Sequence, residues 1–199
     1  MEHPISMLFG LISAIRVRYF NPTRDWPECT FTRLEYDLRT GRLNGLAPDG
    51  PIDGARVFGK ADWFSGRAES PDFDYRRLGL QIGCYTGTIC NFRVILQPAS
   101  RHGARDRAFQ AADFTLIAPN GKTCRLWGNT SEQDLIALLG APIETGPIVN
   151  DRVHTFSVNG TSIDSHHDEI TGQLLELTLT LEDPMVDVGP DGEPREHTA

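Results

Sequence analysis

The feature that most constrains the fold is an internal repeat, in which the second half of the chain matches the first at an offset of roughly eighty residues. Gly140, in the stretch LIALLGAP, aligns with Gly59 in VFGKA. The pairs that follow at the same offset are Asp134 with Asp53, Phe156 with Tyr75, Gly160 with Gly79, and Ile163 with Ile82. Such a repeat predicts two copies of one supersecondary unit, although chance similarity between two generic patterns stays open as the alternative.

Each copy carries the same succession of local signals. Alternating residues in LEYDL and FTLIA predict a first strand, and the turn sequences RTGR and PNGK follow. LNGL or TCRLW then returns as the second strand of a hairpin. Leu34, Tyr36 and Leu38 align with Phe114, Leu116 and Ala118. The two units therefore begin with matching hairpins.

A short helix follows each hairpin. In the second unit Ser131 is a candidate N-cap, with Asp134 three residues on. The apolar face would consist of Leu135, Ile136, Leu138 and Leu139. Gly140 suits the backbone that ends a helix, and Pro142 prevents its continuation. The first-unit helix is weaker because Gly54 interrupts it.

The last strand of each unit alternates most strongly, as NFRVILQ and LLELTLTLE. This pattern predicts antiparallel sheets with one buried face, which a helix or second sheet must cover. We therefore expect an α+β fold of two related units, each an antiparallel sheet with a short covering helix. The predicted boundaries are an N-terminal extension at 1–31, units at 32–98 and 114–183, a basic linker at 99–113 and a disordered tail at 184–199.

Composition excludes some classes of function. The net charge of -8 and the pI near 5.2 argue against nucleic-acid binding, which needs a basic surface. The apolar run Ile5 to Ile15 is too short to span a bilayer and lacks the flanks of a signal peptide. The four cysteines form no CxxC pair, which predicts reduced thiols and no zinc site. We expect a cytoplasmic protein without cofactor or metal; its oligomeric state is not readable from the sequence.

The most suggestive chemical cluster is SHHDE, Ser165 to Glu169. Histidine and aspartate act as metal ligands and as general acids or bases. Neighbouring residues of a strand point to opposite faces, however, and no further pair stands at ligand spacing, so a polar turn is the favoured interpretation. There is also no GxSxG elbow and no phosphate-binding glycine loop. We predict that the protein is not an enzyme.

The helix closed by LG-x-P, with an aromatic strand and alternating strands after it, resembles the units of the β-lactamase-inhibitor-protein fold and of small outer-membrane-assembly lipoproteins. The portions that carry the resemblance are Ser131 to Leu181 and, more faintly, Pro51 to Leu96. The hairpin with NGK before the helix is also similar to small acidic immunity proteins of bacterial polymorphic toxin systems. These resemblances imply recognition of another protein, and no functional residue is carried over from them.

The sequence thus predicts a non-catalytic protein-binding module, in its most concrete form an immunity-type protein that neutralises a basic toxin domain by direct binding. Negative charge would speed association with such a partner. The predicted interface is the acidic and aromatic segment with Asp62, Trp63, Glu69, Asp72 and Asp74. Two alternatives stay open: a small-molecule or metal-dependent enzyme that uses His154, His166, His167 and Asp168, and a scaffold whose sheet edges pair with a partner strand.

Overall fold

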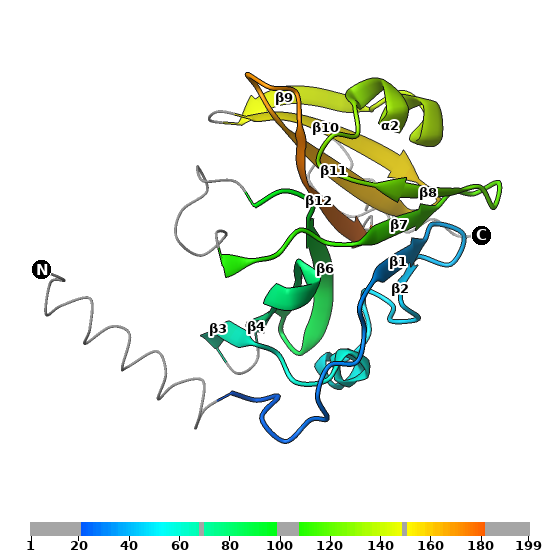
Figure 1. The fold of residues 1–199 in the computed structure, drawn as a ribbon. Helices are drawn as coiled ribbons and strands as arrows, with labels where there is room; N and C mark the ends of the chain where they lie inside the picture. Colours follow the sequence, from blue (N-terminus) through cyan, green and yellow to red (C-terminus); the bar gives the residue numbers. More distant parts are fainter. Residues whose placement is uncertain (1–20, 68–69, 99–107, 149–150, 182–199) are drawn as a thin grey trace, which may run out of the picture.

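The computed structural model describes residues 21–67, 70–98, 108–148 and 151–181, and this part of the chain is mostly β-structure (Figure 1). The first unit contains β1 (Leu34–Asp37), β2 (Arg42–Leu43), β3 (Trp63–Arg67), β4 (Ser70–Tyr75), β5 (Leu80–Tyr85) and β6 (Thr88–Ile95). The second contains β7 (Phe114–Ile117), β8 (Thr123–Leu126), β9 (Glu144–Ile148), β10 (Asp151–Val158), β11 (Thr161–Asp168) and β12 (Leu174–Leu181). The helical elements are the 3-10 helices η1 (Ile52–Phe58) and η2 (Arg76–Leu78) and the α-helix α2 (Glu132–Leu139).

Both sheets contain strands from both units. The larger has the order β3-β4-β5-β6-β12-β11-β10-β9 and is antiparallel throughout, while the smaller has the order β2-β1-β7-β8. In the smaller sheet β1 and β7 run parallel, and Leu34 lies opposite Phe114, its partner in the sequence alignment. In the larger sheet β6 and β12 pair antiparallel, with Val94 opposite Leu177. The two units are therefore joined at two places by backbone hydrogen bonds.

The expected α+β class, with a separate sheet for each unit, is wrong. The helical elements have only 7, 3 and 8 residues, and the strands dominate. A separate sheet in each unit would also leave β6 and β12 as unpaired edges beside each other, whereas pairing them satisfies their backbone groups. The hairpins of β1 and of β7 are likewise too short to form stable sheets alone.

The smaller sheet packs on the inner face of the larger one. The ring of Tyr36, on β1, meets the ring of Phe92, on β6, edge to face at 6.3 Å, and both side chains are fully buried. The Tyr36 hydroxyl lies 3.2 Å from Oγ1 of Thr161, on β11. Strands from both units thus contribute to one continuous hydrophobic core.

The two helices η1 and α2 lie at opposite ends of the molecule (Figure 1). The predicted capping box of α2 is confirmed: Ser131 Oγ accepts from the Asp134 amide at 3.2 Å, and Asp134 Oδ2 accepts from the Ser131 amide at 3.0 Å. Of its apolar residues, Leu135 is the fully buried one. In the first unit η1 buries Phe58, whose ring packs against Tyr75 at 5.6 Å.

Several of the sequence predictions fall outside the described residues. They are Glu69 of the predicted interface, most of the N-terminal extension, the arginines at 101, 105 and 107 of the linker, and the tail. Within the described part of the extension, Trp26 packs against Phe73 at 5.8 Å between ring centroids. No helix in the described part of the chain has the length and apolar character needed to cross a membrane.

The two aligned glycines Gly59 and Gly140 provide a matched test of the fold. Both have positive φ, 73° and 94°, so alanine is strained at either position. A Cβ at Gly59 would lie 2.5 Å from the Pro27 carbonyl oxygen, whereas one at Gly140 meets nothing within 4 Å. We expect Gly140→Ala to lower the free energy of unfolding by about 1–2 kcal/mol, and Gly59→Ala to lower it by clearly more. Urea denaturation measures both, and equal losses would contradict the packing at Gly59.

Candidate functional site: the histidine cleft

A polar pair occupies a position in the second unit that is apolar in the first. In the first unit Phe64, on β3, lies opposite Phe73, on β4. The alignment that matches Gly59 with Gly140 places Thr145, on β9, opposite His154, on β10, at the equivalent position, and the strands pair in this register. His154 is 2% exposed. Thr145 is exposed on the outer strand. Because the phenylalanines show that the fold accepts apolar side chains here, the buried His154 points to a role beyond packing.

Both ring nitrogens of His154 face polar groups. Nδ1 lies 3.0 Å from the Thr145 hydroxyl oxygen. Nε2 lies 3.3 Å from a carboxylate oxygen of Glu132, the first residue of α2, without the alignment of a hydrogen bond. The helix start and the strand pair therefore converge on one buried imidazole.

His167 lies beside His154, with 5.4 Å between the ring centroids, and is 3% exposed. A β-bulge between His166 and His167 shifts the register against β12 at this point. Nδ1 of His167 lies 3.4 Å from the carbonyl oxygen of Gly172, whereas Nε2 has no hydrogen-bond partner among the described residues. Burial lowers the pKa of His167, and the neighbouring His154 adds to this, although the contact with Gly172 opposes it. The ring is therefore neutral at pH 7.

His167 lines a cleft of about 290 Å³, which we call the histidine cleft. The other lining residues are Ser131, Glu132, Gln133, Arg152, Asp168, Glu169, Thr171 and Gly172. They come from the first turn of α2, from β10, and from the end of β11 with its following turn. Three acidic residues and one arginine are among the lining residues, so the net charge of the lining is negative when His167 is neutral.

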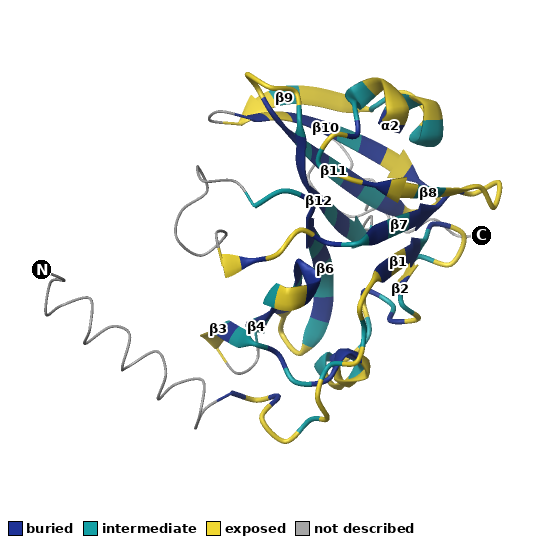
Figure 2. Ribbon diagram, in the orientation of Figure 1, coloured by how far each residue is buried: buried dark blue, intermediate teal, exposed yellow. Residues whose placement is uncertain are grey.

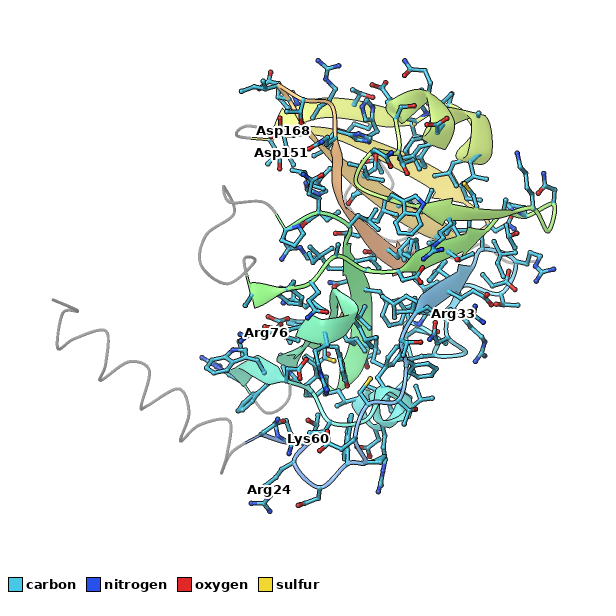
Figure 3. The ribbon with its side chains drawn as sticks, in the orientation of Figure 1. Arg24, Arg33, Lys60, Arg76, Asp151 and Asp168 are labelled. Atoms are coloured by element: carbon cyan, nitrogen blue, oxygen red, sulfur yellow. The ribbon has the colours of Figure 1, made fainter. Side chains whose placement is uncertain are left out.

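Asp168 shapes the turn at the mouth of the cleft. Its Oδ1 accepts hydrogen bonds from the backbone amides of Ile170 at 3.0 Å and Thr171 at 2.8 Å. Figure 3 places Asp168 and Asp151 side by side, and the two residues lie opposite each other in the pairing of β10 with β11. This carboxylate therefore fixes the loop that carries Glu169 and Gly172.

The interpretation of SHHDE as a polar turn is wrong. Ser165 to Asp168 belong to β11, and the turn begins only at Glu169. The alternation of buried residues through Thr161, Ile163 and Ser165 continues to His167, so the strand extends into the polar cluster.

Of the four residues considered for an enzyme, the structure brings three to this end of the large sheet. His154 and His167 lie ring to ring, and Asp168 lines the cleft. The fourth, His166, points to the opposite face of the sheet, where its Nδ1 lies 4.0 Å from Asp151 Oδ2. Within the described ranges, no three His, Cys, Asp or Glu side chains are arranged to hold a metal ion.

The predicted acidic and aromatic interface lies far along the sheet, on β3 and β4. Trp63 is partly exposed, with the Arg76 guanidinium 5.2 Å from its ring centroid. Asp74 is 0% exposed and accepts a hydrogen bond from Gln81 Nε2 at 2.7 Å. Its carboxylate thus serves the sheet and does not reach the surface.

The other two described members of that set are partly exposed. Asp72 Oδ2 accepts from the Ser65 hydroxyl at 3.0 Å. Asp62 lies 3.5 Å from Arg77 Nε and lines a second cleft, of about 320 Å³. That cleft is also lined by Cys29, Thr30, Phe31, Thr32, Tyr75, Arg77 and Leu78. Burial raises the pKa of the Cys29 thiol, so the thiol is protonated at pH 7. The surface around Trp63 is therefore smaller and less acidic than the sequence suggests.

Comparison with known proteins assigns no family to this chain. No family model matches the chain, and no match was found among curated proteins. Solved structures with a similar arrangement include a DUF4309 family protein from Bacillus subtilis, 12% identical with a TM-score of 0.42, covering 69% of this chain and 82% of that one. An extracellular protein containing an SCP domain from Bacillus anthracis is 10% identical with a TM-score of 0.44, covering 68% of this chain. A cysteine-rich secretory protein from Staphylococcus aureus is 13% identical with a TM-score of 0.37, covering 87% of this chain.

This chain spans 44% of the Bacillus anthracis protein and 59% of the Staphylococcus aureus protein. Similarity at this level carries no argument about function. None of the three bears on the inhibitor or immunity classes that the sequence resembles.

The shifted pKa of His167 predicts a pH dependence of stability. Folding lowers the pKa of this side chain below the 6.5 of a free imidazole, so the unfolded chain binds more protons than the folded chain just below that pH. The contribution of His167 to the free energy of unfolding is therefore full above about pH 6.5 and is lost as the pH falls toward the folded-state pKa. His167→Gln should flatten this part of the stability curve, as measured by urea denaturation between about pH 5 and 7.

The matched control is His166→Gln, on the opposite face of the same strand. It should leave the slope close to that of the wild type. The titratable groups that act on the pKa of His167 are His154, Glu132 and, as the smallest contribution, His166. His154 and Glu132 are retained in both variants, and the control removes only the smallest of the three. A wild-type slope in His167→Gln would show that this imidazole is not the buried neutral group described.

Proposed function

We propose that this protein is a non-catalytic binding module for a basic protein partner. The observation that supports this best is a group of exposed isoleucines along the free edge of the large sheet. Ile143, Ile148 and Ile170 are 68%, 53% and 80% exposed, and we call them the isoleucine edge. Exposed apolar side chains gathered on one edge are typical of protein interfaces.

Ile148 and Ile170 lie toward one end of the isoleucine edge, and Ile143 lies at the other end of β9. β9 is the terminal strand of the sheet, and Ile143 precedes it while Ile148 ends it. Ile148 pairs with Asp151, which pairs with Asp168, so the turn that carries Ile170 lies two strands away, at about 10 Å. Figure 2 shows this end of the molecule as largely exposed around β9 and α2. A partner that lies along the whole length of β9 would reach all three side chains.

Charge supports a basic partner. The chain carries a net charge of -8, and the histidine cleft beside the isoleucine edge is lined by Glu132, Asp168 and Glu169. Opposite charge raises the rate of association and disfavours acidic competitors. A toxin domain neutralised in the manner of an immunity protein is the concrete partner we propose, with the cytoplasm as the location, where four unpaired cysteines would stay reduced.

The test is a pair of substitutions on the isoleucine edge. In-cell crosslinking of the tagged protein should recover a basic partner, whose affinity is then measured by calorimetry. Ile148→Ser with Ile170→Ser should weaken that affinity at least tenfold, roughly the effect of truncating interface anchors. Raising the salt concentration should weaken it further, because the charges are exposed.

Two control variants show whether any loss of affinity is specific to the isoleucine edge. Tyr85→Ser removes a side chain that is 67% exposed at the tip of the β5–β6 hairpin, in the first unit, and should leave affinity unchanged. Trp63→Ala tests the surface predicted from the sequence. Loss of binding in Trp63→Ala with none in the isoleucine variant would move the interface to β3, and recovery of no basic partner would reject the proposal.

A second candidate, catalysis on a small molecule, is favoured by one observation: the neutral His167 lies in the histidine cleft beside Glu132. A neutral imidazole next to a carboxylate has the character of a general base. When candidate ligands are followed by NMR, an enzyme would produce new ligand signals over time. A binding module would leave the ligand chemically unchanged.

A further inference from the structure

We infer that the histidine cleft is a binding site for a guanidinium or primary ammonium group. The inference stands apart from the proposed function, because it concerns the chemistry of the cleft and requires no protein partner. It rests on a buried acceptor atom without a donor, on the charge of the lining, and on the way the start of α2 is capped.

The buried acceptor is Nε2 of His167. The Gly172 carbonyl oxygen can only accept hydrogen bonds, so its contact with Nδ1 at 3.4 Å places the ring proton on Nδ1. In the neutral ring Nε2 then carries a lone pair, and it is buried without a partner among the described residues. An unsatisfied buried acceptor costs free energy that a ligand N–H would recover.

The charge of the lining residues determines which kind of hydrogen-bond donor the cleft favours. Glu132 and Glu169 are acidic residues of the lining. Asp168 also belongs to the lining, and its carboxylate is tied to the turn amides. Arg152 is the one cationic side chain among the lining residues. Carboxylates together with a neutral imidazole acceptor form a set that suits a group with several N–H donors and a positive charge.

The start of α2 does not turn the cleft into an anion site. The first free amides of a helix attract anions when they lack partners. Here the Asp134 amide donates to Ser131 Oγ, and the Ser131 amide donates to Asp134 Oδ2. The helix also begins with the carboxylate of Glu132, which would repel an anion. A cationic ligand is therefore the better match.

The cleft of about 290 Å³ is at the lower limit for small-molecule pockets, which suits one side chain or one small amine. The group could belong to an arginine or lysine of a protein, or to a free amine. Both sources present the same chemistry to Nε2 of His167 and to Glu132. They differ only in whether a peptide backbone around the cationic side chain adds affinity.

The experiment is an NMR titration of the full chain that follows the histidine ring nitrogens. N-acetyl-arginine amide is the probe, and N-acetyl-citrulline amide, which has the same shape without the charge, is its control. We expect a saturable shift of the His167 Nε2 signal with the arginine probe and at least tenfold weaker binding of the citrulline probe, because charge-assisted hydrogen bonds are roughly twice as strong as neutral ones. Agmatine and an arginine-containing peptide separate the two sources: equal affinity indicates a free amine, and tighter peptide binding indicates a protein side chain.

Two variants locate the site. Glu132→Gln keeps the shape of the side chain and should weaken the arginine probe about tenfold, while His166→Gln, on the opposite face, should bind as the wild type does. The ring-nitrogen spectrum of each variant also verifies that it is folded. Equal binding of the arginine and citrulline probes, or no shift of His167 with any probe, would overturn the inference while leaving partner binding at the isoleucine edge to its own test.

Discussion

The pairing of β6 with β12 is the interaction on which the rest of the structure depends. Each is the last strand of its unit, and each has an alternating pattern that makes one face apolar. Left unpaired, each would be a long exposed edge. Joined through Val94 and Leu177, they give an eight-stranded sheet whose inner face the smaller sheet covers. The position of every functional residue follows from this join, because it fixes β9 and β3 as the two outer strands.

The repeat also makes the chain its own control. The two units have the same order of elements, but the side chains on and beneath their outer strands, β3 and β9, differ. In the first unit the Phe64 and Phe73 pair continues the hydrophobic core. In the second unit Thr145 and His154 hold a polar layer that reaches Glu132 and His167. A buried polar group weakens packing unless it is satisfied, and the buried His154 stands where the first unit has the apolar Phe73.

Local structure could be predicted from the sequence because short-range signals determine it. Ser131, Asp134 and Gly140 mark both ends of α2, and the spacing of leucines in β12 gives its buried face. The sharing of sheets could not be predicted, because strand pairing between distant segments leaves no local mark. His167 and Asp168 were among the candidate residues, but Glu132 and Thr145 were missed. The repeat alignment could have identified Thr145, because it places this polar residue at the position equivalent to Phe64.

The isoleucine edge and the histidine cleft lie at the same end of the sheet, and this placement favours a common use. The turn after Asp168 contributes Ile170 to the edge and Glu169 to the cleft, and Asp168 holds that turn through two backbone amides. Apolar contact along β9 would anchor a partner, and an acidic recess beside it would accept a cationic side chain, the arrangement that gives an interface both affinity and selectivity. A free amine in the cleft would instead compete with such a side chain, so that the two sites would oppose each other. Both units supply the core, and the residues of the two proposed binding surfaces belong to the second unit.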